Sequence, residues 1–135
     1  MATKIFVNLP VSDLQKSIEF FRQVGYTFNP QFTDETATCM IISEDIYAML
    51  LTHAKFRDFT PLPISDAKKA TEVLTALSCD SREQVDQLLA RALAAGANEF
   101  SDAKDYGFMY YRSFQDLDGH IWEYLWMDPS FVQKS

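Results

Sequence analysis

Apolar and polar residues follow the same order twice along the chain. Residues 4–11 form an apolar run rich in β-branched side chains, which predicts a strand, and apolar residues at helical spacing follow it as far as Val24. Residues 72–79 form a second strand-like run, and Val85, Leu88, Leu89 and Ala92 again fall on one face of a predicted helix. The repeated order predicts two units of similar build.

Each predicted helix is bounded by the same signals. A serine precedes the helix, with a glutamine three residues later, in the pairs Ser12–Gln15 and Ser81–Gln84. A glycine follows the last apolar position, at Gly25 and at Gly96, where the chain needs a residue that adopts positive φ freely. These signals are common in proteins, so a chance repeat is the alternative to a true internal duplication.

Further strands complete each unit. In the first half, residues 26–28 predict a short strand, and the β-rich runs 37–43 and 46–52 predict a hairpin. In the second half, residues 107–115 and 120–127 predict two strands joined by a turn at Asp116-Leu117-Asp118-Gly119.

A linker separates the two units. Residues 53–71 contain two prolines and no strong period, with a short predicted helix over 55–59. We therefore expect one domain over residues 1–135, built from units at about 3–52 and 72–127.

Composition excludes several classes of protein. The 135 residues are 47% hydrophobic and 23% charged, which is typical of a globular chain. The formal net charge of −7 argues against binding to nucleic acid. No run approaches the roughly 18 apolar residues of a membrane span, and the N-terminus does not resemble a secretion signal. Two cysteines, Cys39 and Cys79, are expected to be free thiols, which fits a cytoplasmic location.

The last predicted strand places aromatic and acidic side chains on opposite faces. Trp122, Tyr124 and Trp126 alternate with Ile121, Glu123 and Leu125. Three large aromatic side chains favour the face covered by a helix, so Glu123 is expected on the other face. That carboxylate is either part of a functional site or an ordinary exposed residue of a solvated sheet.

Two motifs resemble a known family. Residues 116–123, Asp-Leu-Asp-Gly-His-Ile-Trp-Glu, resemble the closing motif of the vicinal oxygen chelate superfamily of glyoxalases, bleomycin resistance proteins and extradiol dioxygenases, and residues 9–14 resemble its opening segment. The chain is most similar to the small glyoxalase-like proteins of that group. The resemblance implies an α+β fold of two βαβββ units, whose curved mixed sheet forms a half-barrel around a central cleft with the helices outside.

The resemblance also implies four positions for metal ligands. They correspond here to Phe6, Leu50 (or Leu51) and Leu74, which have no donor atom, and to Glu123, which has one carboxylate. One carboxylate does not form a closed site for a transition metal, so no metal cofactor is expected. The only histidines, His53 and His120, are expected to face the linker and the turn.

A ligand-binding cleft remains as the predicted site. Its expected lining is mostly apolar with a few polar points, and consists of Phe6, Asn8, Ala48, Leu50, Thr52, Leu74, Ala76, Ser78 and Glu123. Two residues of the preceding strand are added, Tyr110 as a ring that stacks on a ligand and Arg112 as a candidate partner of Glu123.

Three functions are compatible with this site. The first is metal-free binding of a small molecule, which the acidic charge and Glu123 predict to be cationic or aromatic. The alternative is a metal-dependent lyase, isomerase or dioxygenase of the glyoxalase type, with Glu123 as ligand and base. The third is an interaction module whose cleft is filled by its own side chains. In all three a homodimer is expected, because exposed sheet edges favour a covering partner.

Overall fold

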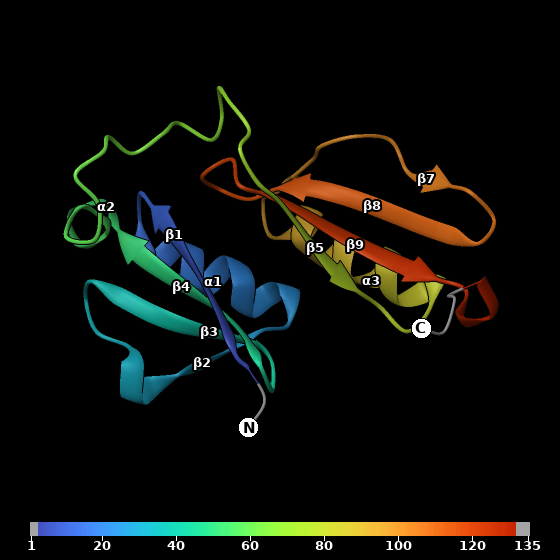
Figure 1. Cartoon of the computed structure of the whole chain (residues 1–135), viewed down its shortest axis with the longest axis horizontal. Helices are drawn as coiled ribbons and strands as arrows, with labels where there is room; N and C mark the ends of the chain where they lie inside the picture. Colours follow the sequence, from blue (N-terminus) through green and yellow to red (C-terminus); the bar gives the residue numbers. More distant parts are fainter. Residues whose placement is uncertain (1–2, 132–135) are drawn as a thin grey trace. The chain divides into compact units, whose positions relative to one another are not determined.

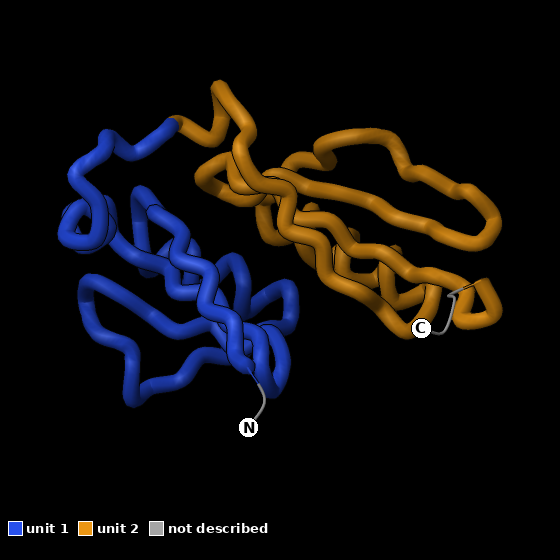
Figure 2. Tube along the Cα trace, viewed as in Figure 1, with its two compact units in different colours: residues 1–65 blue, residues 66–135 orange. Residues whose placement is uncertain are grey.

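The chain folds as two compact units, with the boundary along the sequence between residues 65 and 66 (Figure 2). The structure is a computed structural model that describes residues 3–131. No helix in this range is long and apolar enough to cross a membrane.

The first unit contains a four-stranded sheet with one helix across it (Figure 1). Its elements are β1 (Ile5–Val11), α1 (Leu14–Val24), β2 (Thr27–Asn29), a short 3-10 turn η1 (Pro30–Phe32), β3 (Ala37–Ser43), β4 (Ile46–Thr52) and α2 (His53–Arg57). The strand order is β1-β4-β3-β2, with β1 parallel to β4 and the other pairs antiparallel.

The second unit repeats that order. Its elements are β5 (Leu74–Ser78), α3 (Arg82–Ala94), β6 (Asn98–Glu99), β7 (Lys104–Asp105), β8 (Met109–Gln115), β9 (Ile121–Met127) and the 3-10 turn η2 (Pro129–Phe131). The strand order is β5-β9-β8-β6, and β5 is parallel to β9 as β1 is to β4. The predicted repeat is therefore confirmed, with one difference: the counterpart of β2 is broken into β6 and β7, which both pair with β8.

These observations confirm the predicted fold class, α+β with two mixed sheets. Each unit begins with a strand, continues with the helix that covers the sheet, and ends with the hairpin that supplies the two central strands (Figure 1). Because the first strand pairs in parallel with the last, the helix forms the crossover that parallel pairing requires.

The helix starts differ in part from the prediction. In α3, the Ser81 hydroxyl accepts a hydrogen bond from the Gln84 amide at 3.1 Å, as expected of a capping residue. In α1 the capping residue is Asp13 and not Ser12, because the Asp13 carboxylate accepts from the Lys16 amide at 3.1 Å. The Asp13 carboxylate, one position later, offers the same kind of acceptor, and its negative charge is also stabilised by the positive end of the helix dipole.

The helix in the linker starts earlier than predicted. It spans His53–Arg57 instead of residues 55–59, because the Thr52 hydroxyl, at the end of β4, accepts from the Lys55 amide at 3.2 Å and caps the new helix at once.

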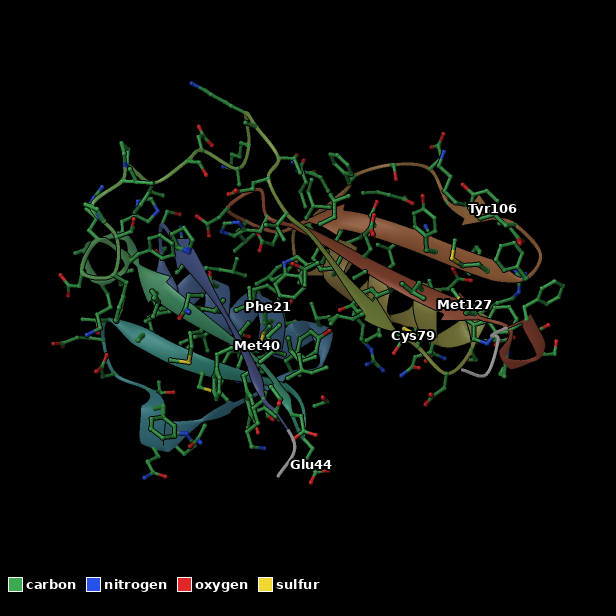
Figure 3. All side chains as sticks on the ribbon, viewed as in Figure 1. Phe21, Met40, Glu44, Cys79, Tyr106 and Met127 are labelled. Atoms are coloured by element: carbon green, nitrogen blue, oxygen red, sulfur yellow. The ribbon has the colours of Figure 1, made fainter. Side chains whose placement is uncertain are left out.

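The two helix–sheet interfaces form the apolar cores. In the first unit, Phe21 of α1 and Met40 of β3, both labelled in Figure 3, are at most 1% exposed. In the second, Leu89 of α3 packs in the core with Trp122 and Tyr124, which are each 1% exposed. The aromatic face of β9 is thus the helix-covered face, as the alternation predicted.

A close approach in the second unit gives the first testable expectation. Gly119 has φ +89°, and a Cβ there would lie 2.8 Å from the Lys68 backbone nitrogen and 3.0 Å from the Ala67 carbonyl carbon. Gly119→Ala should therefore lower the free energy of unfolding by about 2–4 kcal/mol, through backbone strain and overpacking. Urea unfolding followed by tryptophan fluorescence measures it, since both tryptophans lie in this unit.

Gly107→Ala is the matched control. Gly107 also has positive φ, +80°, but nothing lies within 4 Å of its would-be Cβ. Only the strain remains, and about 1–2 kcal/mol is expected. Equal losses in the two variants would contradict a specific contact between Gly119 and the segment around Lys68.

Candidate functional site

The face of the second sheet opposite α3 carries the candidate site. Its residues follow from the strand registers, because paired residues point to the same side of a sheet. We call it the Glu123 face; it comprises Leu74, Ala76 and Ser78 of β5, Ile121, Glu123, Leu125 and Met127 of β9, and Met109, Tyr111, Ser113 and Gln115 of β8.

Glu123 lies near the middle of this face. It is half-buried, and its cross-strand partners are Ala76 on β5 and Ser113 on β8. The Ser113 side chain is fully buried, and its hydroxyl lies 2.9 Å from that of Ser101, so the two hydroxyls are hydrogen-bonded to each other. The carboxylate is therefore flanked by a methyl group and by a hydroxyl that already has a partner.

Tyr111 is the aromatic residue of the Glu123 face. It pairs with Leu125 on β9, which places its ring on the same side as Glu123. Burial raises the pKa of the Tyr111 phenol, and the neighbouring Tyr106 and the negative charge of Glu123 raise it further. Sequence reasoning missed Tyr111, although strict alternation from Glu123 through an unbroken hairpin would have selected it.

The structure corrects the placement of Tyr110 and Arg112. The register between β8 and β9 is continuous, so both residues lie on the α3 face and not beside Glu123. The Tyr110 hydroxyl donates to Asp86 of α3 at 2.6 Å, and Arg112 donates to Asp86 at 3.0 Å and to Glu99 at 3.1 Å. Arg112 therefore joins the helix to the sheet and is not the partner of Glu123.

These two residues act on the Asp86 carboxyl. The hydrogen bond from Tyr110 lowers the pKa of Asp86, and the hydrogen bond and charge of Arg112 lower it further, against the opposing effect of burial. Asp86 thus remains ionised and joins α3 to β8.

The expected residues of the first unit also fall on two different faces. Phe6 pairs with Tyr47 and Asn8 pairs with Met49, and the rings of Phe6 and Tyr47 stack with centroids 4.9 Å apart. Leu50 has the opposite orientation and is fully buried under α1.

The expected grouping of Phe6 and Asn8 with Ala48, Leu50 and Thr52 is therefore wrong. The parallel register pairs Phe6 with Tyr47, not with Ala48, and this sets the orientation of every later residue of β4. Thr52, which shares the orientation of Leu50, caps α2. In the second unit the expectation holds better, since Leu74, Ala76 and Ser78 do share one face with Glu123.

The described donors do not form a metal site. Phe6, Leu50 and Leu74 have no ligating atom, and among residues 3–131 no group of three or more His, Cys, Asp or Glu side chains is close enough to hold an ion. His53 begins α2, and the His120 amide donates to Asp116 at 3.0 Å beside the turn. The residues that surround Glu123 thus do not fit the ligand set that the family resemblance implies.

The turn before β9 explains the other acidic residue of the closing motif. Asp116 is 7% exposed and accepts hydrogen bonds from the amides of Asp118 and His120 and, at 3.0 Å, from the Trp122 indole nitrogen. Burial raises the pKa of Asp116, while the nearby His120 and these hydrogen bonds oppose the rise. The carboxylate fixes the turn and one core side chain, and so sets the orientation of the strand that carries Glu123.

Comparisons with known proteins agree with the fold. The family model described as "Bleomycin resistance protein-like N-terminal" matches residues 3–43, which span β1 to β3. Solved structures of glyoxalase/bleomycin resistance/dioxygenase proteins share the fold, as detailed below. The predicted resemblance to the vicinal oxygen chelate superfamily is confirmed. No curated protein sequence matches the chain.

Three solved structures illustrate the likeness. A hypothetical protein from S. aureus is 26% identical, with a TM-score of 0.78, over 93% of this chain and 94% of its own. A glyoxalase/bleomycin resistance protein/dioxygenase family enzyme from Burkholderia phytofirmans PsJN is 18% identical, with a TM-score of 0.78, over 93% and 99%. The fosfomycin resistance protein FosX from Listeria monocytogenes is 17% identical, with a TM-score of 0.68, over 100% and 96%.

The Asp116 turn gives a second expectation. Asp116→Asn places an amide N–H₂ against at least one N–H donor, so it should lower the free energy of unfolding by about 1–3 kcal/mol. Urea unfolding at a series of pH values measures the loss. Because burial raises the pKa of the folded-state carboxyl, wild-type protein gains stability from its proton at low pH, and the gap to the variant should narrow as the pH rises through that pKa.

Asp102→Asn, at an exposed position of the same unit, is the control and should leave stability unchanged within about 0.5 kcal/mol. A gap that widens with rising pH would show that the Asp116 carboxylate, and not its protonated form, is the favoured state in the folded protein.

Proposed function

We propose that this chain binds small molecules through the Glu123 face, and that its ligands combine an apolar or aromatic body with a positive charge. The observation that carries the proposal is a half-buried carboxylate, Glu123, on a sheet face that also presents the Tyr111 ring and the apolar side chains of Leu74 and Leu125. A mostly apolar surface with one well-placed charge is how small-molecule sites are commonly built.

Charge supports a cationic ligand. The chain has a formal net charge of −7, which attracts cations at long range. None of the ion pairs formed among residues 3–131 includes Glu123, whereas Arg112 and Arg82 are each paired with carboxylates on the α3 side. A ligand cation would supply the opposite charge on this face, and Tyr111 would add a cation–π contact.

The names of similar structures fit a binding role. One is named as a fosfomycin resistance protein and another as a glyoxalase/bleomycin resistance protein. We carry over from these names only the idea that this fold recognises small molecules, since a fold alone does not determine chemistry. The donors around Glu123 do not fit a metal, and this favours binding over the alternative of a metal-dependent reaction.

We also propose that the protein is a homodimer. The edge strands β1 and β5 expose apolar side chains, with Ile5 and Phe6 more than half exposed on β1 and Leu74 more than half exposed on β5. Unpaired strand edges of this kind favour a partner, and a second copy of the chain is the simplest one.

A cytoplasmic location belongs to the same proposal. Cys39 and Cys79 are both free thiols, as expected of a protein that works in a reducing compartment.

Glu123→Gln tests the charge. Phenyltrimethylammonium and its uncharged isostere tert-butylbenzene serve as probes, and chemical-shift titration of the ¹⁵N-labelled protein gives each dissociation constant. The wild-type chain should prefer the cation. The variant should bind the cation about tenfold more weakly, which is about 1.4 kcal/mol, and bind the isostere unchanged.

Glu72→Gln is the matched control, because it removes the same charge from an exposed position just before β5. It should leave both constants unchanged. The proposal is wrong if the wild-type chain binds neither probe, or if Glu123→Gln and Glu72→Gln change the dissociation constant of the cation equally. If binding of the cation requires added Zn²⁺ or Ni²⁺, the metal-dependent alternative replaces it.

Tyr111→Leu tests the face. Replacing the ring should weaken binding of phenyltrimethylammonium by about 0.5–2 kcal/mol, since the cation–π contact is lost. The neighbouring Tyr110→Phe, which acts on the α3 face, should cost about 1 kcal/mol of stability and leave affinity unchanged. The reverse pattern would place the ligand on the other side of the sheet.

A further inference from the structure

The β7–β8 hairpin brings a second tyrosine to the edge of the Glu123 face. Lys104 pairs with Tyr111, and the Tyr106 amide donates to the Met109 carbonyl at 2.8 Å, so the chain reverses within the two residues between them. Gly107 holds the first of these two positions with φ +80°, as hairpin turns of type II′ require. Figure 3 labels Tyr106 beside β7 and Met127 at the end of β9.

Tyr106 stands next to Tyr111. The two ring centroids lie 6.4 Å apart with 29° between the ring planes, and the Phe108 ring centroid lies 6.4 Å from that of Tyr106. Tyr106 is 55% exposed, so burial does not fix its ring. The position of this ring therefore depends on what holds the backbone of the hairpin.

Arg82 holds that backbone. Its guanidinium donates to both carboxylate oxygens of Asp105, at 2.8 and 3.0 Å, and to the Gly107 carbonyl at 3.0 Å. Asp105 in turn accepts from the Gly107 amide at 2.9 Å. One side chain thus joins the residues on both sides of Tyr106, with the two-pronged geometry that makes arginine–carboxylate pairs specific.

Two aromatic rings fix the guanidinium itself. It lies 5.2 Å from the ring centroid of Tyr110 and 5.0 Å from that of Trp126, both on the α3 face of the sheet. A guanidinium stacked in this way loses little further freedom when it binds the hairpin. The hairpin is therefore attached, through Arg82, to side chains of the central strands β8 and β9.

The position of Arg82 at the start of α3 is unfavourable for the helix itself. Arg82 is the first residue of α3, where a positive charge opposes the helix dipole. A residue with no other role would be better acidic there. The hydrogen bond from Arg82, followed by that of the Gly107 amide, lowers the pKa of Asp105 to about 2, so the pair stays charged at every pH above that range.

We infer that Arg82 is a positioning residue that holds Tyr106 against the Glu123 face, and that the resulting pair of phenol rings selects ligands with a flat aromatic ring. This rests on the proposed function, because it assigns the ligand class of the same face. A flat ring stacks on two neighbouring tyrosines, whereas a compact aliphatic cation contacts Glu123 and only one ring.

Arg82→Met tests the inference, since it keeps an unbranched side chain that can pack on the rings and removes the guanidinium with its hydrogen bonds and charge. The first readout is native-state cleavage by chymotrypsin after Tyr106 and Phe108, identified by mass. Cleavage should be about tenfold faster than in wild type, which corresponds to about 1.4 kcal/mol of easier local opening. Arg82→Lys keeps the charge without the two-pronged geometry of the guanidinium, so its cleavage rate should fall between those of wild type and Arg82→Met.

The second readout is selectivity, given as the ratio of the dissociation constants of tetramethylammonium and phenyltrimethylammonium. The ratio should be well above one in wild type and fall toward one in Arg82→Met, with tetramethylammonium binding unchanged. Loss of a charge that opposes the helix dipole would, by itself, stabilise α3 and change neither readout. Arg91→Met, at an exposed position of the same helix, is the control for loss of charge.

The outcomes separate the two proposals. If the wild-type chain binds neither ammonium ion, the proposed function is wrong and the inferred selectivity falls with it. If wild type binds both and Arg82→Met keeps the ratio, or if cleavage does not accelerate, the function stands and the role of Arg82 is wrong. Faster cleavage together with a reduced ratio supports the inference.

Discussion

The packing of α3 against the aromatic side of β9 determines which side chains of that strand the second unit presents on its other face. Trp122 and Tyr124 need a broad apolar cover, and the helix provides it. Alternation along the strand then places Glu123 on the side opposite α3, the one α-helix that the structure describes within residues 66–131. The hydrogen bond from the Trp122 indole to Asp116 stabilises this orientation of β9, because turning the strand over would leave a buried donor unpaired.

The same interface explains why the two sides of β8 have different roles. On the helix side, charged residues form a connected set in which Arg112 bridges α3 and β6, and Arg82 bridges α3 and the β7–β8 turn. On the other side the side chains are mostly apolar or aromatic, with the Glu123 carboxylate near the middle. Polar contacts thus stabilise the α3 side of the β8–β9 pair, and the side proposed to bind ligands takes no part in them.

The sequence predicted the order of the elements, the repeat and the covered face of β9, because capping residues, glycines and alternation are local signals. Two things were beyond it. The parallel register that pairs Phe6 with Tyr47 is set by contacts between distant segments, so Leu50 was assigned to the wrong face. For β8, Tyr110 and Arg112 were predicted on the side of Glu123, whereas the continuous register with β9 places Tyr111 on that side and both of them on the α3 face. In both cases an error of one residue moved side chains across the sheet.

The close approach between Gly119 and the backbone at Lys68 has a practical consequence. The segment before β5 packs against the turn that precedes β9, so it belongs to the second compact unit and not to the first. Segmental isotope labelling or fragment complementation should therefore divide the polypeptide ahead of Asp66. A split at residue 72, where the strand pattern begins, would separate Ala67 and Lys68 from Gly119 and expose the turn that precedes β9.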